Sequence, residues 1–472
     1  MPRQTAQAEA TVPNGRSCQL HPMPSSSLLW GHTQEFFADP LGFLRRAARY
    51  GPLAQLRLVN VRAILLTEPE DIKHVLVDNN RNYIKSRGVR QLKRVLGEGL
   101  LTSEGAFWRR QRRLIQPAFH RKRIAGYATV MTRFTERHLA DWQEGQQRDI
   151  HQEMMHLTME IVTKCLFDAD IRQEAQELGQ AINQLLADFD FRRIGPIGEF
   201  LERLDRQRQR RFQENLEVLD RLIYQLIQER RASGQDHGDL LSMLLQAQDE
   251  EADSAEARGM TDRQVRDEAM TLFIAGHETT ANALSWTFYL LAQHPAVTAR
   301  LHQELDAVLG PPENGRGRLP TLADLERLPY TRQVLEESMR LYPPAWIIGR
   351  EAVGPDRVGG CAIQPGQVFF MSQYVTHHDP RFWPHPERFI PERFTPEEAR
   401  KRPKFAYFPF GGGPRLCVGE PFARMEAHLL LATIAHRYRL ELVPGAVVRP
   451  LARVTLRPAQ GLPMLLHVRG PR

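Results

Sequence analysis

The chain has 472 residues, and its 63 lysines and arginines against 56 aspartates and glutamates give a formal net charge of +7. This length exceeds the ~250–300 residues at which one hydrophobic core usually stops growing, so length alone suggests two or three domains. A modest basic excess without a recognisable nucleic-acid-binding module argues against nucleic acid as a partner. The cysteines are widely spaced and form no CxxC pair, which favours a reducing compartment and no disulfide framework; they are Cys18, Cys165, Cys361 and Cys417.

The N-terminal part begins without any apolar run, so we predict neither a signal peptide nor a membrane anchor there. Residues 1–28 are polar and rich in proline and serine, which is typical of a flexible arm. Residues 34–50 have the pattern of one helix, and residues 53–67 alternate like two strands around Asn60. Pro69 is expected to open the next helix.

Two basic segments follow. Residues 85–101 mix glycine with arginine and lysine. In the next predicted helix Trp108 and Arg112 are four residues apart, so they share one helix face. Such a pair is by itself a weak signal, because a solvated basic helix also explains it.

A long helix is predicted from a cap at Thr261 to about Gln293, just before Pro295. Its centre reads Ala275-Gly-His-Glu-Thr-Thr280. A mid-helix glycine costs about 1 kcal/mol relative to alanine, so a small residue here indicates a close approach or a local helix distortion. Glu278 and Thr279 follow directly. In the non-functional interpretation, Glu278 faces solvent and the Thr279 hydroxyl is bonded back to the helix.

A pairing pattern lies in the predicted helix at residues 330–341. Glu337 and Arg340 are three residues apart and lie on one face, where they can pair. Arg393 stands later, in Pro386-Glu-Arg-Phe-Ile-Pro-Glu-Arg-Phe394. Glutamate–arginine spacings of this kind occur in most helical proteins, so this pattern acquires meaning only with the other motifs.

The segment Phe410-Gly-Gly-Gly-Pro-Arg-Leu-Cys-Val-Gly419 places one cysteine in a glycine-rich turn that leads into a helical pattern. Free backbone N–H groups and the start of the helix both favour the thiolate form of Cys417. A thiolate without a nearby second cysteine or histidine makes a poor zinc site, but it suits the axial position of haem iron. A buried structural cysteine is the alternative.

Taken together, these motifs resemble those of the cytochrome P-450 family of haem-thiolate monooxygenases. The family's cysteine loop is met by Phe410, Gly413, Arg415, Cys417 and Gly419, and the other motifs follow the family's order along the chain. The similarity runs from about residue 30 to 470 and departs from the family at the N-terminal hinge, where relatives carry a denser proline–glycine run.

The resemblance implies a single haem domain at residues 29–472. Its fold would be mainly α with small β-sheets (α+β), with the haem between the long central helix and the proximal cysteine loop and helix. Membrane-bound relatives carry an N-terminal anchor, whereas no apolar run is found in this N-terminal part. This chain is therefore expected to be a soluble, cytoplasmic, bacterial-type member, and we also expect a monomer.

The resemblance also implies how haem b would be held. Cys417 would be the axial ligand of the iron, and Thr279 and Glu278 would be the catalytic acid–alcohol pair that delivers protons. Glu337, Arg340 and Arg393 would form a structural triad. Cofactor contacts are expected from Trp108, Arg112, Ala275, Gly276, Arg350, Phe410, Gly411, Arg415 and Gly419, with Trp108, Arg112 and Arg350 at the propionates.

The implied reaction inserts one atom of O2 into a C–H or C=C bond of a hydrophobic small molecule. Electrons would come from NAD(P)H through a separate ferredoxin or flavodoxin and its reductase, because no reductase-like segment follows the cysteine loop. We expect this donor to dock on basic residues of the proximal side, at Arg109, Arg110, Arg113 and Lys404. The alternatives are a reductase-independent peroxygenase or isomerase, against which the intact Glu278–Thr279 pair argues, and a non-catalytic haem sensor.

The substrate is the least specified part of the prediction. Residues 99–105 and 116–120 look like the branch that contains fatty-acid and terpenoid hydroxylases. A fatty acid would need a cation at the channel mouth, from Arg87, Arg90 or Arg192, whereas a terpenoid or steroid would need only an apolar wall. The resemblance implies substrate contacts, for several of which ordinary packing is the alternative, from Val89, Leu92, Leu185, Phe189, Phe273, Ala345, Trp346, Ile347 and Val454.

Overall fold

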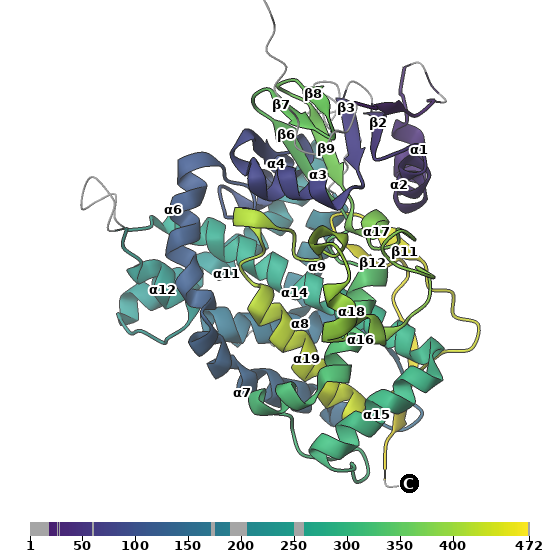
Figure 1. Ribbon diagram of the computed structural model, residues 1–472. Helices are drawn as coiled ribbons and strands as arrows, with labels where there is room; N and C mark the ends of the chain where they lie inside the picture. The colour runs from purple at the N-terminus through teal and green to yellow at the C-terminus, as the bar shows by residue number, and fades with distance from the viewer. Residues whose placement is uncertain are drawn as a thin grey trace, which may run out of the picture.

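The computed structural model describes residues 18–25, 27, 29–58, 61–170, 175–188, 205–249 and 259–470. Helices form most of the molecule, and the strands form one six-stranded sheet and three smaller ones (Figure 1). The mainly helical α+β class predicted from the sequence is therefore confirmed. The helices are α1 Thr33–Ala38, α2 Pro40–Ala48, α3 Pro69–Lys73, α4 Arg87–Gln91, α5 Lys93–Leu96, α6 Gly105–Ile115, α7 Arg121–His138, α8 Ile150–Phe167, α9 Ala175–Ala187, α11 Arg206–Ser233, α12 Leu240–Gln246, α14 Asp262–Gln293, α15 Pro295–Leu309, α16 Pro329–Leu341, α17 Gln373–Thr376, α18 Pro396–Arg400 and α19 Glu420–Arg437.

The largest sheet has the strand order β1-β2-β3-β9-β6-β4 and lies with α1–α4 at one end of the molecule (Figure 1). A three-stranded sheet has the order β10-β13-β5, and two hairpins pair β11 with β12 and β7 with β8. The strands are β1 His21–Pro22, β2 Leu53–Leu58, β3 Val61–Leu66, β4 Tyr83–Lys85, β5 Gln147–Asp149, β6 Ile348–Ala352, β7 Asp356–Val358, β8 Cys361–Ile363, β9 Val368–Met371, β10 Tyr438–Leu442, β11 Pro450–Ala452, β12 Leu456–Pro458 and β13 Pro463–Val468.

The long helix α14 lies at the centre of the helical part, beside α8 and α19 (Figure 1). It begins where predicted, because the Thr261 hydroxyl accepts from Gln264 N while the Gln264 side chain accepts from Thr261 N. The helix has 32 residues, so at 1.5 Å per residue it spans roughly 48 Å. A side chain at Gly276 would bring its Cβ to 2.8 Å from Cγ2 of Val162 on α8. The mid-helix glycine therefore permits close packing of α8 against α14.

The structure corrects the single helix predicted for residues 34–50, which is divided into α1 and α2. Pro40 has no backbone N–H and cannot continue α1, whereas it fits the first position of α2. Asp39 caps α2 by accepting from Gly42 N at 2.9 Å. The paired strands at residues 53–67 and the helix that starts at Pro69 agree with the prediction.

The prediction that the chain has no disulfide is wrong. Cys18 and Cys361 are bonded, with Cα atoms 4.5 Å apart. Their 343-residue separation hid the pair from sequence reasoning, whereas strand pairing brings the two segments together. Strand β1 pairs with β2 next to Leu53, against which Gly359 of the β7–β8 hairpin lies. The described second half of the predicted flexible arm is thus attached to the sheet.

No helix within the described ranges is long and apolar enough to cross a membrane. The cytoplasmic location expected from the sequence stays a prediction.

Candidate active site

A cavity of about 1120 Å³ lies between the centre of α14 and the glycine-rich loop at residues 410–419. Aliphatic residues of α4 and α5 and the segment at residues 344–348 form other parts of its wall, with Val454 at the β11–β12 turn. The cavity therefore joins segments from both halves of the chain.

The loop that carries Cys417 is shaped by its glycines and by backbone hydrogen bonds. Gly413 has a φ of +67°, and a Cβ there would lie 2.0 Å from Leu76 O, so only glycine fits. Cys417 N donates to Phe410 O at 3.1 Å, and α19 begins three residues after the cysteine. The accessible surface of Cys417 faces the cavity, which Phe410, Gly411 and Gly419 also line.

The pKa of the Cys417 thiol is raised because burial disfavours the thiolate. The backbone N–H groups of Gly419 and Glu420 lower it, as the loop sequence suggested, and the positive charge of Arg112 acts in the same sense. In the protein alone, burial outweighs these groups. A coordinated metal cation would reverse the balance, because it deprotonates a ligating thiol.

Basic side chains gather on the same cavity. Arg112 on α6 donates to Leu416 O at 2.9 Å, directly beside Cys417. The guanidinium of Arg415 lies over the Trp108 ring, 3.7 Å from its centroid, and pairs with Glu104. Arg350 on β6 is buried and forms no ion pair in the described part of the chain, and burial lowers its pKa to about 10.

Lys85 is a further cation on this cavity that sequence reasoning missed. It stands opposite Arg350 across the β4–β6 pair, an arrangement that repels unless an anion lies nearby. Burial and the charges of Arg415 and Arg350 hold the pKa of Lys85 well below its usual range. The sequence contains no signal for this juxtaposition, because it depends on the pairing of two distant strands.

These residues fit haem b. The cavity offers one thiol to a metal ion, apolar walls to a flat macrocycle, and the buried Lys85 and Arg350 with the partly buried Arg112 and Arg415 to its two carboxylates. Lys85 and Arg350 form no ion pair among the described residues; the negative charges of Glu104 and Glu268 act on Lys85, and that of Glu104 acts on Arg350. Two opposed basic side chains on the cavity suit an anionic ligand.

The acid and alcohol expected on α14 both line the cavity, but they have different partners. Thr279 Oγ1 donates to Ala275 O at 2.9 Å, so the hydroxyl is bonded back to the helix. The buried Glu278 accepts instead from Thr455 Oγ1 at 2.6 Å. Burial raises the pKa of Glu278, while the Thr455 hydrogen bond and the charge of Arg457 lower it.

Some of the predicted substrate residues line the cavity, and others do not. Six of them line the cavity: Val89, Leu92, Ala345, Trp346, Ile347 and Val454. Leu185 and Phe273 are buried in the hydrophobic core, and their neighbours Leu186, Leu272 and Ile274 line the cavity instead. Helical geometry explains this result, since adjacent residues point about 100° apart. Phe189 and Arg192 lie outside the described residues.

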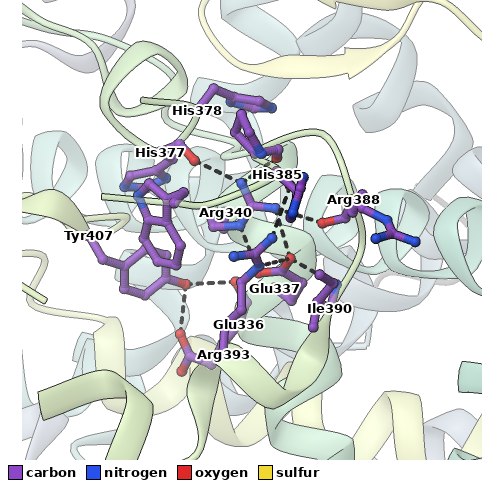
Figure 2. A network of polar contacts seen from close by, with 12 residues as sticks. Glu336, Glu337, Arg340, His377, His378, His385, Arg388, Ile390, Arg393 and Tyr407 are labelled. Carbon is purple, nitrogen blue, oxygen red and sulfur yellow. Dashed lines mark hydrogen bonds and ion pairs between the residues drawn. The ribbon is translucent and has the colours of Figure 1, made fainter. Parts of the chain in front are cut away.

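The structure brings Glu337, Arg340 and Arg393 together (Figure 2). Arg340 donates to both Glu337 oxygens, at 2.7 and 2.8 Å, with both side chains fully buried. Arg393 Nε lies 3.3 Å from Glu337 Oε1. Arg340 also donates to backbone carbonyls of His377, Pro386 and Arg388, so it joins α16 to the segment that precedes the cysteine loop.

Comparison with known proteins gives one consistent family. The model of the family described as Cytochrome P450 matches residues 22–462. The chain is 40% identical over 436 residues to cyclooctatin synthase of Streptomyces melanosporofaciens, with 92% of each chain covered. It is 37% identical to cyclooctat-9-en-7-ol 5-monooxygenase of the same organism, over 93% of this chain and 94% of the relative.

Two further comparisons agree. Pentalenene oxygenase of Streptomyces avermitilis is 32% identical, over 95% of this chain and 97% of the relative. The solved structure titled "Crystal structure of cytochrome P450DA heme domain" superposes with a TM-score of 0.85 at 27% identity, covering 97% of this chain and 99% of that one.

Proposed function

Because this chain belongs to the cytochrome P-450 family and is a monooxygenase with a haem b cofactor, we propose that its substrate is a cyclic terpenoid hydrocarbon or alcohol. The reaction would insert one oxygen atom into a C–H or C=C bond of that substrate. The electrons would come from NAD(P)H through a ferredoxin or flavodoxin and its reductase.

In this proposal each group at the cavity has one task. Cys417 would hold the iron through Sγ, and Lys85, Arg112, Arg350 and Arg415 would hold the propionates with the Trp108 N–H. When bound, haem b supplies the activation of dioxygen.

Two residues of α14 handle protons beside that site. Thr279 Oγ1 donates to Ala275 O, so its lone pairs remain available to accept from a water in the cavity. The Glu278 carboxyl holds the proton that this pair delivers, and it regains a proton from water in the cavity.

The observation that carries the substrate proposal is the pairing of the cations near the cavity rim. Arg90 donates to Glu351 at 2.8 Å, and Arg87 lies 3.9 Å from the same carboxylate. Arg45, which also lines the cavity, pairs with Glu387 at 2.5 Å. At these three arginines a fatty-acid carboxylate would compete with Glu351 or Glu387, whereas an uncharged substrate needs only the aliphatic wall. The names of two relatives, a pentalenene oxygenase and a cyclooctat-9-en-7-ol monooxygenase, support the same substrate class.

An optical titration of the ferric holoenzyme tests this proposal. Pentalenene or cyclooctat-9-en-7-ol is expected to give a saturable low-to-high-spin shift, because an apolar ligand displaces water from the iron. A long-chain fatty acid is expected to bind at least about tenfold more weakly, because its carboxylate would leave water without gaining a free arginine as partner. Imidazole serves as the control that the iron is accessible. Tighter binding of the fatty acid than of either terpenoid would reject the proposed class.

The basic face proposed for the electron donor is smaller than the sequence suggested. Arg110 and Arg113 both pair with Asp249, at 3.1 and 2.6 Å. Arg109 on α6 and Lys404 remain exposed, and we assign the docking site to these two.

Charge reversal tests this docking site. Arg109→Glu together with Lys404→Glu is expected to slow reduction by an acidic ferredoxin about tenfold and to flatten its salt dependence, because long-range attraction is lost. The matched control is Arg210→Glu on α11, where the arginine is 83% exposed. Unchanged stopped-flow reduction rates across a salt series in the double variant would place the docking site elsewhere.

A further inference from the structure

Three side chains on one face of α14 reach the segment at residues 454–457. Glu278 accepts from Thr455 Oγ1 at 2.6 Å, Asn282 Nδ2 donates to the same hydroxyl at 3.1 Å, and Trp286 Nε1 donates to Leu456 O at 3.0 Å. These residues are four apart, so they form one stripe along the helix. The stripe fixes the β11–β12 turn against the part of α14 that carries the proton-delivering pair.

The direction of the bond between Thr455 and Glu278 is set by its surroundings. A threonine hydroxyl has one proton to donate, and its lone pairs accept. The amide of Asn282 donates to Thr455 Oγ1, so the hydroxyl proton is directed to Glu278 Oε1. Thr455 and Glu278 are 7% and 4% exposed and Asn282 is fully buried, so water competes little for these bonds.

The same short segment also contacts substrate space and solvent. Val454 and Thr455 line the cavity. Arg457 lies two residues further along the chain, and its charge acts on Glu278. Its Nη1 also donates to Asn183 on α9 at 3.3 Å, at the exposed edge of this site.

We propose that Thr455 is a positioning residue that orients the Glu278 carboxyl for proton delivery. The bond engages Oε1 and leaves Oε2 to exchange a proton with water in the cavity. The inference rests on the proposed role of Glu278 in proton delivery.

The test compares Thr455→Val, which keeps the shape and removes the hydroxyl, with Thr455→Ser, which keeps the hydroxyl. Infrared spectroscopy of the holoenzyme follows the Glu278 carboxyl band, which is identified by its loss in Glu278→Gln. In Thr455→Val this band is expected to move to higher wavenumber and to titrate at higher pH, because the hydrogen bond that lowers the pKa of Glu278 is gone. Thr455→Ser is expected to restore both properties.

Turnover provides the second readout, with pentalenene as the probe substrate and a surrogate ferredoxin and reductase. Peroxide released per NAD(P)H is expected to rise about tenfold in Thr455→Val, and Glu278→Gln in the same background should add little. Thr287→Val is the matched control, because Thr287 is buried on the same helix and donates only to Ala283 O in the described structure.

The outcomes separate the two ideas. Unchanged coupling in Glu278→Gln itself rejects the proton-delivery role, whatever Thr455→Val does. If Glu278→Gln releases peroxide while Thr455→Val leaves both the carboxyl band and the coupling unchanged, the positioning role is wrong and the delivery role stands. The infrared arm gives its answer even where pentalenene is not turned over.

Discussion

Replacing Cys417 with serine is expected to abolish the red-shifted absorption band that the reduced haem protein gives with carbon monoxide. Monooxygenase turnover is expected to fall at least about 100-fold. The thiolate is the donor that tunes haem iron for O–O cleavage, and an alcohol is a weaker and far less acidic ligand. Burial raises the pKa of the Cys417 thiol despite the backbone N–H groups of Gly419 and Glu420 and the charge of Arg112, so these groups would not turn the much less acidic serine hydroxyl into an equivalent donor. The measurement is the difference spectrum of the reduced protein with and without carbon monoxide, together with product formation.

Cys165 provides the matched control for this experiment. It is the other free cysteine of the described chain, it lies buried on α8, and it is not among the residues that line the cavity. Cys165→Ser is expected to retain the carbonyl band. Retention of that band in Cys417→Ser would mean that another residue ligates the iron. The 410–419 loop would then not be the segment that supplies the iron ligand.

Replacing Glu337 with glutamine is expected to lower the free energy of unfolding by about 3–5 kcal/mol. The substitution leaves the fully buried Arg340 guanidinium without its carboxylate, and an unpaired charge in the interior is costly. It also weakens the bond from Ile390 N, which lies 3.0 Å from Glu337 Oε1, and the contact with Arg393 (Figure 2). Urea unfolding of the holoenzyme, followed by the loss of haem absorbance, measures the effect.

A surface pair gives the comparison. Arg300 and Glu392 form an ion pair whose side chains are 55% and 44% exposed, so Glu392→Gln should cost less than about 1 kcal/mol. Where Glu337→Gln fails to accumulate, Arg393→Gln offers a milder variant, because it leaves the Arg340–Glu337 pair intact. Equal unfolding midpoints for Glu337→Gln and Glu392→Gln would show that the buried network does not stabilise the fold.

The local features of this protein could be predicted from its sequence. The 410–419 loop, the capped helix from Thr261 and the strand pair near Asn60 each depend on residues within a few positions of one another. Glycine permits a positive φ, a threonine cap satisfies a helix end, and alternation selects a strand, whatever the rest of the chain does. These features, with the spacing of the motifs, were sufficient for the family and the cofactor.

The exact face of each helix was decided only by tertiary packing. Leu185 and Leu186 have the same chemistry, yet Leu186 lines the cavity and Leu185 packs into the core. A sequence pattern specifies that a helix has a buried side, but it does not distinguish burial against protein from burial against a ligand cavity. Phe273, predicted to contact substrate, lies in the core for the same reason.

The partners of the charged and polar groups were likewise decided by the tertiary structure. Lys85 meets Arg350 through strand pairing, Thr455 reaches Glu278 across 177 residues of sequence, and Asp249 pairs with two of the arginines expected to be available to an electron donor. Such contacts depend on distance and burial between segments that are remote in the chain. Because the energy of a charge or a hydrogen bond depends on both quantities, the sequence by itself determined which chemical groups are present, and only the fold determined which of them act on one another.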